Sequence, residues 1–312
     1  MLALTLARGA AGSLFKRGPY DDARLPSDRL VLPGVRVDAG RLAAYARVCG
    51  FPPDTGTLPV TYPHLLGFPG ATRLMARRSF PFPLLGLVHT GVEIVQHRAL
   101  RTEDTPEIRV WAEGLRAHRR GSEFDMLTSA WVAGEETWWS RSTYLCRHRP
   151  AGGSPERTSG ADASGTDSGT GRDDAADADT PLPVRAHWRL PGDLGRRYGA
   201  VSGDRNPIHL HPVTARAFGF PSAIAHGMWS VARCLAEQAE QAAGSDGDSA
   251  RPSDRPAGRT AERVSVGARF RAPVPLPGSV TYGERDGAFE LRGGSAERPR
   301  THLTGWVSSE PR

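Results

Sequence analysis

The spacing of hydrophobic residues along the first half of the chain predicts helices followed by antiparallel strands. Ala39–Cys49 carries apolar residues at helical intervals, and a second helical segment begins near His64, where Gly67, Pro69 and Gly70 are expected to interrupt it. Alternating stretches rich in Val, Ile, Trp and Thr predict strands before and after these helices. The strands are expected at Arg29–Val37, Leu84–Leu100, Pro106–His118, Ser122–Val132 and Thr137–Arg147. The order of elements is that of an α+β unit.

The second half of the chain repeats this order. A strand at Val184–Leu190 and a helix at Asp193–Val201 precede a long apolar run, Met228–Ala243, which also has helical spacing. Prolines at positions 273, 275 and 277 mark a kink or a sheet edge among the strands that follow. These strands are expected at Arg263–Ala272, Gly278–Glu284, Ala288–Arg292 and Thr301–Val307.

A short sequence echo supports the repeat. Tyr45–Gly50 and Tyr198–Gly203 align at a constant offset, with identical residues at the Tyr, Val and Gly positions. Carried forward, this offset places Phe51 opposite Asp204 and Gly56 opposite His209. The first half is therefore expected to keep the frame of the second without its acid and base.

Two stretches of low complexity divide the pattern. Ala151–Pro181 is acidic and nearly free of large apolar side chains, so it cannot bury enough surface to offset the entropy of ordering. We expect an N-terminal unit at 1–150, a disordered acidic linker at 151–181, and a C-terminal unit at 182–312 with a flexible insertion at 244–260. Leu4–Phe15 is predicted to form a short amphipathic helix, with a transit peptide as the alternative because no acidic residue occurs before Asp21.

Composition narrows the class of protein. The 312 residues carry a net charge of +6, and all basic residues except Lys16 are Arg. The Arg pairs are scattered without an aromatic platform between them, which argues against nucleic acid, although local patches could attract the phosphates of coenzyme A or an acidic carrier protein. Cys49, Cys146 and Cys234 have no metal or disulfide spacing, which fits a reducing cytoplasmic setting. Neither a signal peptide nor a membrane span is expected, since the N-terminus lacks the signal pattern and no apolar run approaches 18 residues.

The residues that suggest chemistry gather between Tyr198 and Ala232. Asp204 and His209 flank Pro207, which should hold them on an irregular turn, where a carboxylate and an imidazole can share one water. Gly227 opens the long helix, and the first N–H groups of a helix are unpaired and positively polarised. Such a group can stabilise an oxyanion.

Structural explanations exist for each of these residues taken singly. Asp204 and Asn206 could be turn or cap residues, and His209 and His226 could be structural histidines. The combination is more specific: the small residues Ser202 and Gly203, the Asp-x-Asn-Pro-x-His turn and then a helix opened by Gly occur in this order.

The run from Tyr198 to His209, followed by Ala225-His-Gly-Met228, resembles the signature of the (R)-specific enoyl-thioester hydratases and MaoC-like dehydratases. The resemblance implies a double hot-dog fold, in which antiparallel sheets wrap long central helices. It also implies that Asp204 and His209 activate one water and that the Gly227 N–H binds the thioester carbonyl.

Other residues of the motif are expected to shape the site. Asn206 matches the Asn of the family motif and is expected to shape the turn through hydrogen bonds, while Met228 completes the helix opening. Ser202 is favoured as a small residue at a helix end, and His226 as a scaffold residue. His64 is predicted to be a relic or a packing residue, and His211 to face solvent.

The resemblance implies reversible hydration of trans-2-enoyl thioesters to (R)-3-hydroxyacyl thioesters. The substrate would be an acyl-CoA or an acyl-carrier-protein thioester, with no metal and no cofactor beyond the coenzyme A or phosphopantetheine of the substrate. Two alternatives stay open, a hot-dog acyl thioesterase and a non-catalytic acyl-binding subunit. A homodimer of double hot dogs is possible by analogy, and the degenerate first half is expected to widen the pocket through its interrupted helix.

Overall fold

The computed structural model describes residues 16, 20, 22–53, 55–149, 180–245, 262–295 and 298–311. The helix predicted at Leu4–Phe15, nearly all of the linker predicted at 151–181 and most of the insertion predicted at 244–260 lie outside these residues. Below, the first half means the described residues up to 149, and the second half means those from 180 onward.

One antiparallel sheet of ten strands runs through the molecule, in the order β1-β3-β4-β5-β2-β8-β12-β11-β10-β6. The strands of the first half are β1 (Leu30–Leu32), β2 (Leu87–Gln96), β3 (Glu107–His118), β4 (Gly121–Val132) and β5 (Glu135–Arg147). Those of the second half are β6 (Val184–Leu190), β8 (Glu262–Phe270), β10 (Gly278–Arg285), β11 (Ala288–Ser295) and β12 (Arg298–Pro311). A separate small sheet pairs β7 (Ala223–Ile224) with β9 (Pro275–Leu276), the proline-rich edge that the sequence predicts.

The two sets of five strands meet at β2 and β8. These strands pair antiparallel from Gly91 with Arg269 to Gln96 with Val264, so the halves share backbone hydrogen bonds. Counted outward from this seam, the order is β2, β5, β4, β3, β1 on one side and β8, β12, β11, β10, β6 on the other. Each side follows the same chain order, so the two halves have the same connectivity.

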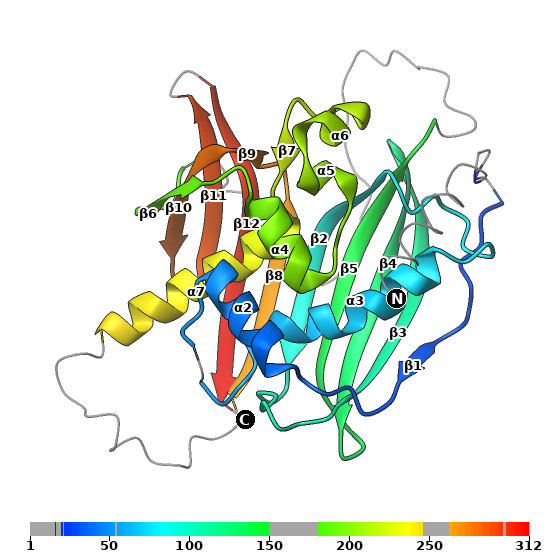
Figure 1. Cartoon of the computed structure of the whole chain (residues 1–312), viewed down its shortest axis with the longest axis horizontal. Helices are drawn as coiled ribbons and strands as arrows, with labels where there is room; N and C mark the ends of the chain where they lie inside the picture. Colours follow the sequence, from blue (N-terminus) through cyan, green and yellow to red (C-terminus); the bar gives the residue numbers. More distant parts are fainter. Residues whose placement is uncertain are drawn as a thin grey trace, which may run out of the picture.

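The helices cover one face of the sheet (Figure 1). They are α2 (Ala39–Cys49), α3 (Tyr62–Met75), α4 (Leu194–Ser202), α5 (Pro207–Leu210), α6 (Pro212–Ala217) and α7 (Gly227–Ser245). Figure 1 shows α3 crossing the strands of the first half and α7 crossing those of the second. Among the described residues, none of the helices combines the length and apolar character needed to span a bilayer.

The expected interruption of α3 at Gly67–Gly70 is wrong. The helix is continuous from Tyr62 to Met75 with Pro69 inside it. The glycines serve packing instead, because a Cβ at Gly67 would clash with the side chain of Thr128, and one at Gly70 would lie 3.1 Å from Cγ2 of Val110. Helix and sheet therefore approach more closely than larger residues would permit.

The sequence echo corresponds to a structural repeat. Both α2 and α4 end at a glycine in the left-handed conformation, Gly50 with φ of 85° and Gly203 with φ of 83°. The two helices pack side by side, and the rings of Tyr45 and Tyr198 lie 6.2 Å apart. Arg41 links them further, since its guanidinium donates to the carbonyl oxygens at the end of α4.

The equivalence does not extend as far as the constant offset suggests. After the capping glycine, residues 51–61 lead to α3, whereas the longer segment 204–226 leads to α7 and contains α5, α6 and β7. Phe51 and Asp204 each follow the capping glycine, but Gly56 has no structural correspondence with His209, because α5 has no counterpart in the first half.

Candidate active site

The turn that carries Asp204 is held by its own short side chains. The N–H of Asp204 donates to Ser202 Oγ at 3.1 Å, and the N–H of Asn206 donates to Asp204 Oδ1 at 3.1 Å. Ser202 is therefore more than the small residue that the sequence favours, because its hydroxyl fixes the backbone on which Asp204 stands. The side chain of Asp204 is 28% exposed, so its carboxylate is accessible from the solvent.

His209 lies on a one-turn helix, where the sequence predicts only an irregular turn. Asn206 caps α5 by accepting the N–H of Ile208 at 3.4 Å, and Pro207 occupies a position that needs no donor. The ring of His209 is buried, and its Nδ1 lies 2.8 Å from the carbonyl oxygen of Ile224. A carbonyl only accepts, so Nδ1 carries the proton and Nε2 keeps its lone pair.

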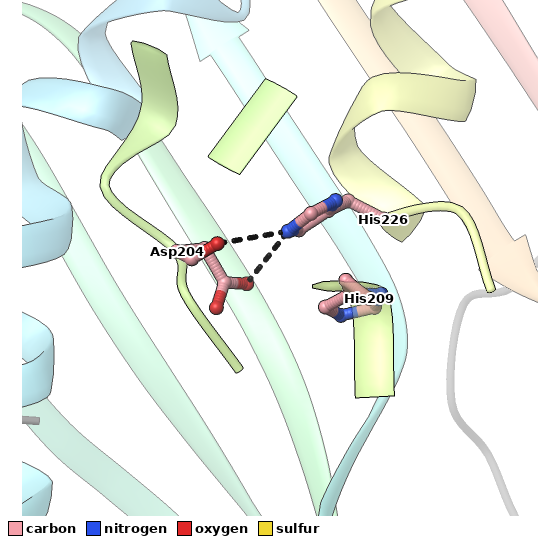
Figure 2. A group of neighbouring side chains, drawn as sticks. All are labelled: Asp204, His209 and His226. Atoms are coloured by element: carbon pink, nitrogen blue, oxygen red, sulfur yellow. Dashed lines mark hydrogen bonds and ion pairs between the residues drawn. The ribbon is translucent and has the colours of Figure 1, made fainter. Parts of the chain in front are cut away.

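His226 is the residue before α7, and it binds the Asp204 turn (Figure 2). Its Nε2 lies 3.0 Å from the backbone oxygen of Asp204 and 3.9 Å from the carboxylate Oδ2. The rings of His226 and His209 are stacked with centroids 3.7 Å apart. The imidazole of His226 thus connects the Asp204 turn to His209, a position consistent with the scaffold role that the sequence favours.

Burial keeps both imidazoles neutral. It lowers the pKa of His209, although the negative charge of Asp204 and the hydrogen bond to Ile224 act in the opposite direction. Burial and the neighbouring His209 lower the pKa of His226 to about 3, again against the effect of Asp204. At neutral pH, His209 therefore offers a lone pair to the site.

Gly227 and Met228 form the first turn of α7. Ser230 is the first residue of this helix whose N–H finds an acceptor one turn back, at the carbonyl of His226, so the earlier N–H groups have no partner within the helix. A Cβ on Gly227 would lie 2.8 Å from Cε1 of Phe270, so any other residue here would have to displace this ring or the helix start.

All these groups face one cavity. Asp204, Asn206, His209, Gly227 and Met228 line it together with Ser202, Tyr198 and His226. The sequence-predicted residues are thus brought together, with Gly203 and Pro207 acting on the backbone behind them. His211, by contrast, is exposed and caps α6 by accepting the N–H of Val213.

The structure adds two residues that the sequence did not connect with the site. His64 on α3 and His89 on β2 line the same cavity, although both belong to the first half. The sequence predicts a packing or relic role for His64 and none for His89. No local signal could have found them, because their approach to Asp204 depends on how the two halves are joined.

Three side chains that could ligate a metal lie close together in the site. One ligand atom each from Asp204, His209 and His226 lies within 4.8 Å of the others. Nε2 of His226 donates its proton to the backbone oxygen of Asp204, so on this ring only Nδ1 keeps a lone pair.

Comparison with known proteins places this geometry in a family. The sequence model described as "MaoC like domain" matches residues 175–282, which include Asp204, His209, His226 and Gly227. The chain is also 33% identical over 305 residues to 3-hydroxyacyl-thioester dehydratase X of Mycobacterium tuberculosis, a match that covers 97% of this chain and 96% of that protein. The chain belongs to the MaoC-like dehydratase family.

Solved structures of MaoC-like proteins share this fold. The crystal structure of HtdX of Mycobacterium tuberculosis is 30% identical with a TM-score of 0.66, and the match covers 90% of this chain and 99% of that chain. A MaoC-like dehydratase from Phytophthora capsici is 16% identical with a TM-score of 0.62, covering 93% of this chain and 97% of that one. These likenesses confirm the double hot-dog fold, here with the two sets of strands joined into one sheet.

Proposed function

We propose that the protein catalyses reversible hydration of trans-2-enoyl thioesters to (R)-3-hydroxyacyl thioesters. The observation that carries this proposal is the approach of a carboxylate oxygen of Asp204 to a ring nitrogen of His209, within 4.8 Å. A water that forms two hydrogen bonds of about 2.8 Å at a tetrahedral angle spans roughly 4.5 Å. The pair therefore has the separation that one shared water requires.

Each group then has a defined task in hydration. Nε2 of His209 accepts a hydrogen bond from the water and orients the water oxygen toward C3. Asp204 takes the other hydrogen of the water as a proton while the C–O bond forms. The electron pair of the double bond moves toward the thioester, and Asp204 returns its proton to C2 from the same face. Dehydration reverses these steps, and all the proton transfers use groups of this chain.

The start of α7 stabilises the negative charge that develops on the thioester oxygen. The Gly227 N–H is an unpaired donor at the positive end of the helix dipole. One such donor is worth about 3–4 kcal/mol in other enzymes. Coenzyme A or an acyl carrier protein would carry the thioester, and no further cofactor enters these steps.

The test is the loss of enoyl-thioester absorbance with crotonyl-CoA and with a medium-chain enoyl-CoA, followed by chiral analysis of the product. We expect the (R)-alcohol from the wild type, and a decrease in kcat of about 10²–10⁴ in Asp204→Asn and in His209→Ala. The exposed His187, which is outside the cavity, gives a matched control in His187→Leu.

Other outcomes would contradict the proposal. Release of free thiol from saturated acyl-CoA, abolished by the same two substitutions, would indicate a thioesterase. Absence of turnover with both coenzyme A and acyl-carrier-protein thioesters would indicate a non-catalytic acyl-binding subunit.

A further inference from the structure

His64 and His89 form a polar wall of the cavity that the proposed mechanism leaves unused. Their rings are nearly parallel, with an angle of 8° and centroids 6.4 Å apart. His89 in turn packs against Tyr144 and Phe270, each with its centroid 4.8 Å away. Phe270 is the ring that covers Gly227, so this wall adjoins the start of α7.

The internal repeat indicates which way His64 points. Thr61 and His226 are the residues before α3 and α7, so His64 and Trp229 both occupy the third position after them. Trp229 crosses to the other half, where its Nε1 donates to the Val48 oxygen near the end of α2 at 2.9 Å. The same position on α3 therefore faces the end of α4, which leads directly to Asp204.

The electrostatics agree with this placement. Burial lowers the pKa of His64 to about 4, and the charge of Asp204 opposes that decrease. The carboxylate acts in the same way on His89, whose pKa burial lowers to about 3. The charge of Asp204 thus acts on neutral imidazoles of both halves, which line the same cavity.

Nε2 of His64 is available to a ligand. It forms no hydrogen bond within the described part of the chain, whereas Nδ1 is enclosed without a hydrogen-bond partner. A proton on Nε2 leaves a lone pair, rather than an N–H, on the enclosed Nδ1. This tautomer gives the cavity a donor beside Asp204.

We propose that His64 is a substrate-binding residue, which donates its Nε2–H to the oxygen at C3 of the 3-hydroxyacyl thioester. The thioester oxygen lies at the start of α7, so the oxygen beside Asp204 is the one that enters or leaves as water. The inference rests on the proposed hydratase function. It means that the first half, which lacks an acid and a base of its own, recognises the group on which the second half acts.

The experiment compares His64→Leu with His64→Gln, because an amide of Gln can place a donor where Nε2 lies. In the dehydration direction, we expect kcat/KM for the (R)-3-hydroxyacyl-CoA to fall about tenfold in His64→Leu and to stay within twofold to threefold in His64→Gln. The inhibition constant of the saturated acyl-CoA of equal length, which lacks the oxygen at C3, should be unchanged in both variants. The pH profile of kcat/KM should keep its shape.

Several results would overturn this role. Equal losses in both variants, or a matching rise in the inhibition constant of the saturated acyl-CoA, would make His64 a packing residue. A shift of either limb of the kcat/KM pH profile in the His64 variants would make His64 a proton-transfer group. If the wild type has no turnover, the hydratase proposal fails by itself. Calorimetry with the hydroxyacyl-CoA and the saturated acyl-CoA then decides on His64, because equal affinities in the wild type would contradict the inference, and a preference for the hydroxyacyl-CoA that His64→Leu abolishes would support it.

Discussion

The two halves of the molecule differ most where the chain leaves the short helix. After α2, the N–H groups of Gly50 and Phe51 both donate to the carbonyl of Ala46, which closes the helix end on itself. After α4, Gly203 caps in the same way, but the N–H of Asp204 turns to the hydroxyl of Ser202. One hydrogen bond thus redirects the backbone, and the residue that follows the cap becomes an acid facing a cavity instead of a partly buried Phe.

The starts of the long helices show a second difference. In the first half, Thr61 precedes α3 and its hydroxyl lies 2.7 Å from that of Tyr45. In the second half, His226 holds the equivalent place, and its ring lies 4.9 Å from that of Tyr198. The next residue is the fully buried Tyr62 in one half and Gly227 in the other. The same frame can therefore hold either a packed core or a reaction site, depending on a few side chains and one inserted segment.

Gly227→Ala should give the largest effect, because it makes the second helix start resemble the first. The added Cβ would meet the ring of Phe270, whose Cε1 lies 2.8 Å away. We expect kcat to decrease about 10²-fold through the displaced N–H. The free energy of unfolding should fall by about 1–3 kcal/mol. Steady-state kinetics measure the change in kcat, and thermal unfolding measures the change in stability.

Tyr62→Phe is the matched change in the first half. Its hydroxyl is buried without a hydrogen-bond partner among the described residues, so removing it should cost almost nothing and leave kcat unaltered. A large loss of activity in this variant would show that the first helix start takes part in the reaction.

Acid should destabilise both halves through their buried imidazoles. The pKa values are lowered to about 4 for His64 and to about 3 for His89 and His226, so the unfolded chain binds protons that the native protein does not. Their stabilising effect is complete above about pH 6.5 and is lost as the pH falls toward these values. At pH 5, each of these imidazoles should lower the free energy of unfolding by roughly 2 kcal/mol relative to neutral pH.

Denaturant unfolding between pH 7.5 and pH 5 measures this loss. In His64→Leu, the slope of the free energy of unfolding against pH should decrease by the equivalent of about one bound proton. His187→Leu, at an exposed position, serves as the control. An identical slope for wild type and His64→Leu would mean that His64 binds as many protons in the native protein as in the unfolded chain.

Among the changes expected to cause a measurable loss, Ser202→Ala should give the smallest effect. It removes the acceptor of the Asp204 N–H, which we expect to lower the free energy of unfolding by about 1 kcal/mol. The loss of kcat should be far smaller than in Gly227→Ala, since the acid and base remain. Ser202→Cys, which copies the residue of the first half at position 49, should behave like Ser202→Ala because sulfur is a weak acceptor. Unaltered stability in both variants would mean that the turn does not depend on this hydroxyl.

The local pattern of hydrophobic residues is sufficient to predict the regular helices. The helix at Ala39–Cys49 has the predicted bounds, and the apolar run from Met228 begins one residue inside α7. Both segments carry strong periodicity and end signals that depend only on neighbouring residues. The order of Asp204, His209 and Gly227 in the sequence and the resemblance to the family motif select these residues, and the structure brings them to one cavity.

Features that depend on distant contacts could not be predicted. The glycines of α3 predict an interruption of the helix, since nothing in the sequence shows that Thr128 and Val110 face them. The short elements α5, α6 and β7 are stabilised by caps and by β9, not by periodicity. His64 reaches the cavity only because the halves join at β2 and β8.

That join has a kinetic and an evolutionary consequence. Because both partners of the seam belong to one polypeptide, their encounter is intramolecular, with an effective concentration far above that of separate subunits. Specific activity per chain should therefore stay constant on dilution. A substitution also enters one half alone, whereas a dimer of identical chains would carry it twice. Tyr62 can therefore occupy the first helix start while Gly227 occupies the second.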